Sequence, residues 1–268
     1  MKNNKTLIIA CLVLLVAVII GGGFWYFNKN TKGNNNVNIN TGANIGEGTD
    51  VEKNNEQEKD KIAFNTGFVL LDNESGLIWS EVVELDPEVR AQFQNKVTEM
   101  KADLAVAKEK EQILADYNNL AMYQKYLGNY RESYKAYLES LKIESQARVA
   151  WQNFADVLLK VKAVKSAEMA YKKAVELNKY IPESYIKLAD YYKTVGDNNN
   201  VEATYKLAIE TIKQSMESDT LVLNAYAEWL GGQKRYEEAI KVYEELIVKQ
   251  PDNKEAIERK IDNLKNKK

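Results

Sequence analysis

The chain has 268 residues, with 37 Lys and Arg against 39 Asp and Glu, and a formal net charge of −2. It contains no histidine and a single cysteine, Cys11, which excludes Ser-His-Asp and Cys-His catalysis, histidine-based zinc sites and a disulfide within the chain. Four lysines and no acid lie in residues 1–32, so the remainder has 33 basic and 39 acidic residues, a net −6. An acidic remainder argues against sequence-independent nucleic-acid binding, which needs a basic face.

Residues 7–27 form an apolar run without a single charge. As a helix, 21 residues at about 1.5 Å each would span about 31 Å, the thickness of a bilayer core. The aromatic group Phe24-Trp25-Tyr26-Phe27 would lie where such a helix leaves the bilayer. The pattern predicts a single transmembrane helix and makes residues 1–27 an N-terminal membrane anchor.

Two other interpretations of this segment stay open. A cleaved signal peptide fits the charged start and the apolar run, although no Ala-x-Ala site follows. A lipoprotein signal at Cys11 is a second alternative, although only Leu7 to Ala10 precede the cysteine as an apolar run. Lysines flank both ends of the run, so charge barely decides its orientation. We expect the short polar head inside and the C-terminal bulk outside the cytoplasm, with cysteine-free repeats fitting that side.

Residues 28–60 contain ten asparagines, four glycines and no aromatic residue. Such a composition cannot bury a core, so we expect a disordered linker. As a flexible chain it would span roughly 30 Å root-mean-square, long enough to tether a domain near the membrane.

Residues 61–113 form a pre-repeat region. Apolar residues 68–71 and 77–79 flank the polar stretch 72–76, which predicts a short β-hairpin docked on helices; a short helix over 77–85 is the alternative. Asp86-Pro87 is a typical helix start. Apolar residues then recur every three or four positions and predict a long amphipathic helix over about 88–112, serving as an N-terminal cap or, alternatively, as a dimerisation helix through Phe93.

From residue 114 the sequence repeats itself. Two columns, one of alanines and one of tyrosines, recur at spacings of 34, 34 and 38: Ala121, Ala155, Ala189 and Ala227, and Tyr137, Tyr171, Tyr205 and Tyr243. Large apolar residues precede each alanine by four and by one position, on the same helical face. A fixed period of this length indicates stacked supersecondary units, here pairs of helices.

Turn signals separate the two helices of a unit: Gly128-Asn129, Gly196-Asp197 and Gly231-Gly232, with Lys162-Ala163 in the second unit. Glycine permits positive φ at a helix C-terminus. The four extra residues between Ala208 and Thr220 equal about one helical turn, so we expect the second helix of the third unit to be one turn longer. Residues 254–268 place Ala256, Ile257, Ile261 and Leu264 on one face and predict a C-terminal capping helix.

This pattern of aromatic, leucine, alanine, glycine turn, tyrosine and terminal proline resembles the tetratricopeptide repeat (TPR) family. Residues 127–137 and 236–243 are closest to the family pattern, whereas Asn198 replaces its tyrosine and Lys179 and Lys213 stand in place of Pro251. The resemblance covers 114–253 and implies an all-α, right-handed α-solenoid. Its four repeats would be 114–147, 148–181, 182–215 and 220–253.

The resemblance implies a peptide-binding groove on the concave face, lined by the first helix of each repeat. By helical phase, three rows would line it. The candidate protein-binding residues are Asn118, Asn119, Met122, Gln152, Asn153, Asp156, Lys187, Asp190, Asn224 and Glu228, accompanied by Ile186 and Ala225. Three acids in register suit a basic partner segment, and amides can hydrogen-bond an extended backbone. Some members of the family hold a partner's C-terminal carboxylate with Lys and Asn. Asn153 and Lys187 are present here, but Met122 and acids lie elsewhere along the groove floor, so we expect no clamp of that kind.

The apolar segment and the resemblance together imply a membrane-anchored, single-pass TPR scaffold of bacterial-envelope type, which would bind a partner protein or peptide in its groove. A self-assembling structural component of a membrane complex, joined through the 88–112 helix, is the alternative. An enzyme with a carboxylate site in residues 62–112 is a further hypothesis. No motif pairs the carboxylates for catalysis, so we expect no enzyme, no metal, no cofactor, no nucleic-acid partner and no small-molecule substrate.

Overall fold

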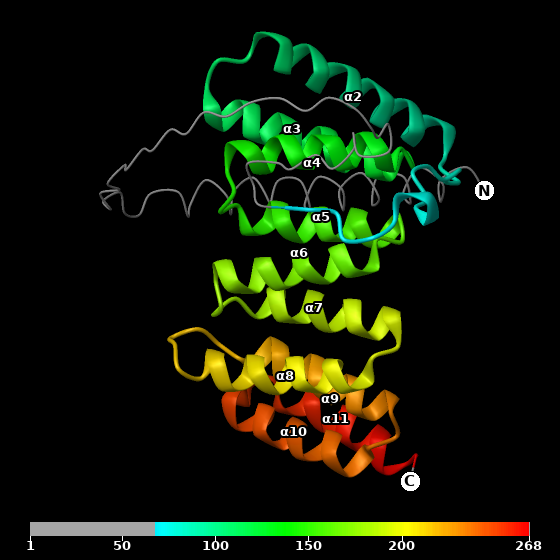
Figure 1. The fold of residues 1–268 in the computed structure, drawn as a ribbon. Coiled ribbons are helices and arrows are strands. Elements are labelled where there is room, and N and C mark those ends of the chain that lie inside the picture. Colours follow the sequence, from blue (N-terminus) through cyan, green and yellow to red (C-terminus); the bar gives the residue numbers. More distant parts are fainter. Residues whose placement is uncertain (1–67, 268) are drawn as a thin grey trace, which may run out of the picture. The chain divides into compact units, whose positions relative to one another are not determined.

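A computed structural model describes residues 68–267. This part contains ten α-helices, two short 3-10 helices and no strand (Figure 1). The predicted membrane segment 7–27 and linker 28–60 lie outside the described residues. Within 68–267, no helix is both long and apolar enough to cross a membrane. The α-helices are α2 (Pro87–Val106), α3 (Lys110–Tyr126), α4 (Tyr130–Ile143), α5 (Arg148–Lys160), α6 (Val164–Leu177), α7 (Pro182–Val195), α8 (Asn198–Ile212), α9 (Thr220–Gly232), α10 (Tyr236–Lys249) and α11 (Lys254–Lys265).

Helices α3 to α10 form four helical hairpins, which follow one another along the array in chain order (Figure 1). All four alanines of the first repeated column are fully buried, as are Tyr137 and Tyr205 of the tyrosine column. A small residue at each alanine position lets the two helices of a hairpin approach closely, while the tyrosine fills the space beside them. The 34-residue period thus reflects the packing of the helices, and the described part of the chain is an all-helical repeat array.

The two helices of each hairpin lie in different layers. Consecutive first helices touch, α3 with α5, α5 with α7 and α7 with α9, whereas consecutive second helices of the described part form no comparable contacts. An array whose first helices are closer together than its second helices curves toward the first helices. Helices α3, α5, α7 and α9 therefore form the inner, concave layer, and α4, α6, α8 and α10 the outer layer.

Both ends of the array are covered by an additional helix. At the N-terminal end, α2 packs on α3, with the ring of Phe93 5.6 Å from the rings of Tyr123 and Tyr126. At the C-terminal end, α11 buries Ile257 and Ile261 against α9 and α10, with Leu264 partly buried. Ala256, predicted on the same face, is exposed instead.

The predicted helix over 88–112 is too long. Asp86 caps α2 through its side chain and Pro87 lies in the first turn, as expected, but α2 ends at Val106 and α3 begins at Lys110. A continuous helix would have to run straight past the first hairpin, whereas the break at 107–109 lets α2 fold back onto α3. Phe93, the residue expected to drive dimerisation, is engaged within the chain.

The predicted β-hairpin over 68–79 is wrong, and so is the alternative helix over 77–85. Residues 68–86 are extended apart from a 3-10 turn at Glu74–Gly76. Instead of pairing with itself, this segment bonds to the inter-helix turns: the N–H groups of Ile78 and Glu81 donate to the carbonyls of Val161 and Gly128. Its backbone groups find partners on the helices, so no second strand is needed.

Side chains of the same segment complete its docking. Asp72 accepts the N–H groups of Lys165 and Ser166 at the start of α6, which has no side-chain cap of its own. Phe68 is buried, with its ring 4.9 Å from that of Phe154, and Trp79 packs edge-on against Tyr134 at 5.2 Å. Residues 68–86 therefore hold the first two hairpins together from the side of their turns.

Positive φ occurs at one register position in all four hairpins: Gly128 (80°), Lys162 (70°), Gly196 (79°) and Lys234 (60°). The spacing is again 34, 34 and 38. The turn predicted at Gly231-Gly232 is therefore wrong, because both glycines belong to α9 and the left-handed residue comes later. Lysine occupies a conformation that favours glycine at two of the four positions.

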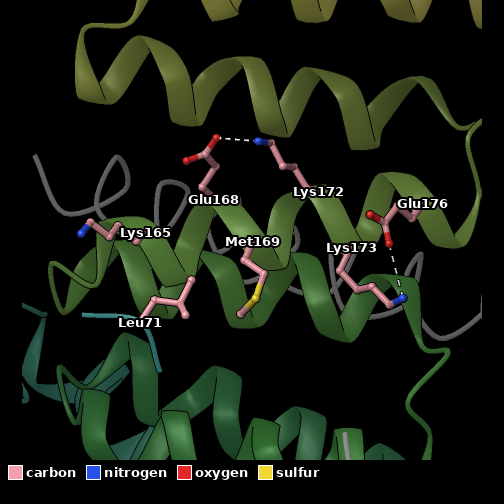
Figure 2. A pocket seen from close by; sticks show the side chains of 7 residues that line it. All are labelled: Leu71, Lys165, Glu168, Met169, Lys172, Lys173 and Glu176. Carbon is pink, nitrogen blue, oxygen red and sulfur yellow. Dashed lines mark hydrogen bonds and ion pairs between the residues drawn. The ribbon is translucent and has the colours of Figure 1, made fainter. Parts of the chain in front are cut away.

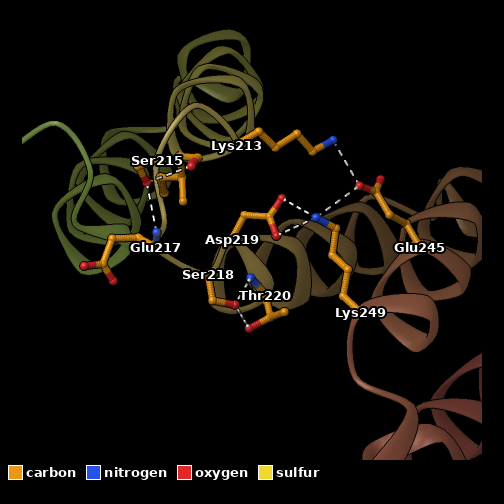
Figure 3. Close-up of polar contacts among 9 residues, drawn as sticks. Lys213, Ser215, Glu217, Ser218, Asp219, Thr220, Glu245 and Lys249 are labelled. Atoms are coloured by element: carbon orange, nitrogen blue, oxygen red, sulfur yellow. Dashed lines mark hydrogen bonds and ion pairs between the residues drawn. The ribbon is translucent and has the colours of Figure 1, made fainter.

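The four-residue insertion does not lengthen a helix by one turn. Helix α8 has 15 residues against 14 in α4 and α6, and the other three residues enlarge the following loop, 213–219. Figure 3 shows how this loop is held: Lys249 of α10 donates to both carboxylate oxygens of Asp219 at 2.9 Å. The Asp219 side chain is only 5% exposed, so the ion pair anchors the loop to α10.

Candidate protein-binding surface

The helices of the inner layer carry the predicted groove residues, but not all of their side chains are free to contact a partner. Asn118 donates to the carbonyl of Leu114 and accepts from the hydroxyl of Ser140. Gln152 is 8% exposed, accepts from Arg148 and donates to Ser184. Both amides are thus occupied by contacts within the chain and tie neighbouring helices together.

The row of residues one position further along each first helix is more accessible. Asn119, Asn153 and Ala225 are half-buried and Lys187 is exposed. Because they recur at one register position on α3, α5, α7 and α9, they run across the inner face from hairpin to hairpin. Amides there can donate to and accept from an extended backbone.

The third row holds Met122 and the three predicted acids, and the structure gives each acid a cationic neighbour. Asp156 lies near Lys125 and Lys187, Asp190 pairs with Lys193 at 2.9 Å, and Glu228 pairs with Lys260 at 2.8 Å. Asn224 completes the last pair, since it donates to Glu228 and accepts from Lys260. No acid of this row is free to attract a basic segment unaided.

Lysines therefore offset the charge of the acids in this row. Lys125 of α3 and Lys187 of α7 flank Asp156, and Lys160 of α5 acts electrostatically on Lys125. Burial lowers the pKa of Lys125, opposed by the Asp156 carboxylate and reinforced by the two other lysines. The three acids of this row thus have four lysine neighbours: Lys125, Lys187, Lys193 and Lys260.

Sequence reasoning missed this balance for a physical reason. The acids recur at one column position and are visible as a row, whereas the lysines come from different positions of different helices. Lys260 even comes from α11, outside the four hairpins. One signal was present: Lys125 and Lys193 are 68 residues apart, two periods.

A shallow hollow of about 330 Å³ lies on the outer layer, along α6, next to Leu71 (Figure 2). Its polar lining is largely neutralised, because Lys172 pairs with Glu168 at 2.8 Å and Lys173 with Glu176 at 3.4 Å. Among residues 68–267, no group of three or more acidic or cysteine side chains could hold a metal ion. The inner face is therefore the stronger candidate site.

Helical hairpins in this arrangement define a TPR/HAT-like repeat protein. A family model described as the PRP39 N-terminal HAT repeat matches residues 91–265, more than half of the chain. The chain belongs to this family.

Three solved structures are similar to part of the chain. MamA gives a TM-score of 0.46 at 16% identity and covers 64% of this chain and 98% of its own. BtubC from P. vanneervenii gives 0.47 at 14%, covering 63% and 75%, and a thermophilic TPR protein of Thermus thermophilus gives 0.44 at 14%, covering 66% and 92%. These likenesses carry no functional argument at such scores. No curated protein gives a significant match.

Proposed function

We propose that this protein is a protein-protein interaction scaffold, which binds a partner protein or peptide along its inner face. The main observation behind this proposal is that each first helix contacts the next, from α3 through α5 and α7 to α9. These helices present accessible polar side chains at repeating positions. A continuous surface built this way can follow an extended partner over several hairpins. The amino-acid composition agrees with this proposal, since the sequence has no histidine and no paired-carboxylate motif for catalysis.

We further propose that the scaffold is held at a membrane. Support comes from the uncharged run 7–27 and the aromatic residues at its end, which suit a single membrane-spanning helix. The Asn- and Gly-rich residues 28–60 would then act as a tether. The repeats would lie on the extracytoplasmic side of a bacterial-type envelope, with the N-terminus inside.

Capture of partners in the native cell tests the scaffold function. The full-length chain is compared with a variant carrying Asn119→Trp and Asn153→Trp, which fills the inner face with two large rings at half-buried positions. The expected result is loss of the captured protein from the variant, because the rings occupy the path of the partner backbone.

Reaction of the full chain with a membrane-impermeant label, added outside intact cells, tests on which side of the membrane the repeats lie.

A matched control places two tryptophans on the outer layer, Asn199→Trp and Lys241→Trp, both at exposed positions. This control is expected to keep the partner. Loss of the partner from the outer variant but not from the inner one would contradict the proposal.

A further inference from the structure

Two lysines from different first helices lie beside a single carboxylate, and a third lysine acts on one of them. Lys125 Nζ of α3 lies 3.8 Å from Asp156 Oδ2 of α5, and Lys187 Nζ of α7 lies 3.6 Å from the same oxygen. Lys160 of α5 is close enough to act on Lys125 electrostatically. The cluster therefore spans the first three hairpins of the inner face and carries a net +2.

The ammonium groups of Lys125 and Lys187 make only long contacts with this carboxylate. Charge-assisted N–H···O bonds are about 2.7–2.9 Å long, so both distances to Asp156 are those of loose ion pairs rather than hydrogen bonds. The other oxygen of Asp156 is already taken, because the Tyr171 hydroxyl donates to it. Each ammonium offers three donors, and one carboxylate cannot occupy them all.

Access and desolvation favour a second carboxylate here. The Lys125 side chain is 17% exposed and that of Asp156 25%, whereas Lys187 is 49% exposed. A partly desolvated ammonium interacts more strongly with an anion than one in bulk water. The other acids of the row, Asp190 and Glu228, are matched by Lys193 and Lys260, so a basic segment would have to displace lysines that are already paired.

We infer that the partner segment is acidic, and that Lys125, Lys160 and Lys187 bind a carboxylate side chain of it. This inference rests on the proposed function and reverses the sequence-based expectation of a basic partner. The two ends of the inner face would then differ: the first three hairpins would bind an anion, whereas the acids toward α9 and α11 are neutralised by ion pairs. The chain beyond residue 32 is acidic, at −6, so non-specific attraction of an acidic peptide is not expected elsewhere.

Two labelled peptides test it with the full-length chain. The probes are a ten-residue alternating Glu-Ala peptide and its Lys-Ala counterpart, both with amidated C-termini, so that only side chains can supply charge. Fluorescence anisotropy gives the Kd of each at about 50 and 200 mM salt. The Glu-Ala peptide is expected to bind more tightly and to weaken as salt rises, because salt screens exposed charges.

Variants locate the site. Lys160→Glu with Lys187→Glu is expected to raise the Kd of the Glu-Ala peptide at least about tenfold, roughly 1.4 kcal/mol. The control, Lys101→Glu with Lys241→Glu, makes the same charge change at exposed lysines of α2 and α10 and is expected to leave the Kd within about twofold. Asp156→Asn removes the competing carboxylate and keeps an acceptor for Tyr171, so it is expected to lower the Kd several-fold, a gain that misfolding cannot produce.

Tighter binding of the Lys-Ala peptide, binding of neither peptide, or equal effects of the cluster and control variants would each overturn the inference. The scaffold function would survive any of these results if the cellular partner is still lost on Asn119→Trp with Asn153→Trp. If that variant also kept its partner, the inner face would no longer stand as the binding site.

Discussion

Glycine has two distinct roles at the same register position of this array. Gly128 and Gly196 share a left-handed conformation, with φ of 80° and 79°. A Cβ added at Gly196 meets nothing, whereas one added at Gly128 would overlap the carbonyl oxygen of Glu81 in the docked pre-repeat segment. The two residues therefore separate the conformational need for glycine from the need for close backbone approach.

Alanine at each position tests this separation. Gly196→Ala is expected to cost about 1 kcal/mol, the strain of a left-handed Cβ, partly offset by a less flexible unfolded chain. Gly128→Ala is expected to cost about 2–3 kcal/mol more, because segment 77–85 must move away. Chemical unfolding followed by circular dichroism, together with acrylamide quenching of Trp79, measures both effects; equal costs would show that the segment does not pack on this turn.

Ion pairs between helices stabilise the second half of the array. Glu202 of α8 accepts two hydrogen bonds from Arg235 at the start of α10 and one from Tyr226 of α9. Arg235, then Lys206 and Tyr226, hold the pKa of Glu202 down to about 2. One carboxylate thus joins three helices and responds to acid.

The sign of the pH effect follows from this depressed pKa. The Glu202 contribution is fully present above its ordinary pKa of 4.5 and is lost as the pH falls toward about 2. Glu202→Gln is expected to lower stability at pH 7 by about 1–2 kcal/mol, after allowance for solvent screening, and to flatten the loss between pH 4.5 and about 2. Chemical unfolding at a series of pH values measures this. Glu210→Gln, which changes an exposed acid of the same helix, is the control. Its free energy of unfolding is expected to equal that of the unchanged protein at each pH.

The enlarged loop 213–219 depends on a more buried pair. Lys249→Met would leave the carboxylate of Asp219 almost without solvent and without its cation, at an expected cost of about 2–3 kcal/mol. Lys213→Met removes an exposed partner of Glu245 and is expected to cost less than about 0.5 kcal/mol. Similar thermal midpoints for the two variants would mean that Asp219 reaches water when Lys249 is absent.

Local periodicity was sufficient to predict the helical hairpins, because the alanine and tyrosine columns pack within and between neighbouring units. It was not sufficient for residues 68–86. Asp72 bonds to Lys165 and Ser166, more than ninety residues away, and no pattern within 68–86 encodes that partner. The predicted hairpin failed because residues with strand-like composition can equally lie extended on helix termini.

At the scale of the whole molecule, the charge of the inner face could not be read from one column. The acids Asp156 and Asp190 are visible as a row, but the cations that neutralise them come from other register positions and, at Glu228, from the capping helix α11. The repeat predicts where the binding surface lies. Only the folded arrangement shows which charge that surface presents.

The most direct test of the central claim is site-specific photocrosslinking in the native cell. A photoreactive phenylalanine derivative is placed at Asn153 on the inner face or at Leu207, exposed on the outer helix α8, in the full-length chain. The scaffold account predicts a protein adduct from position 153 and none of that size from position 207. An adduct from position 207 alone would contradict it and place partner binding on the outer layer.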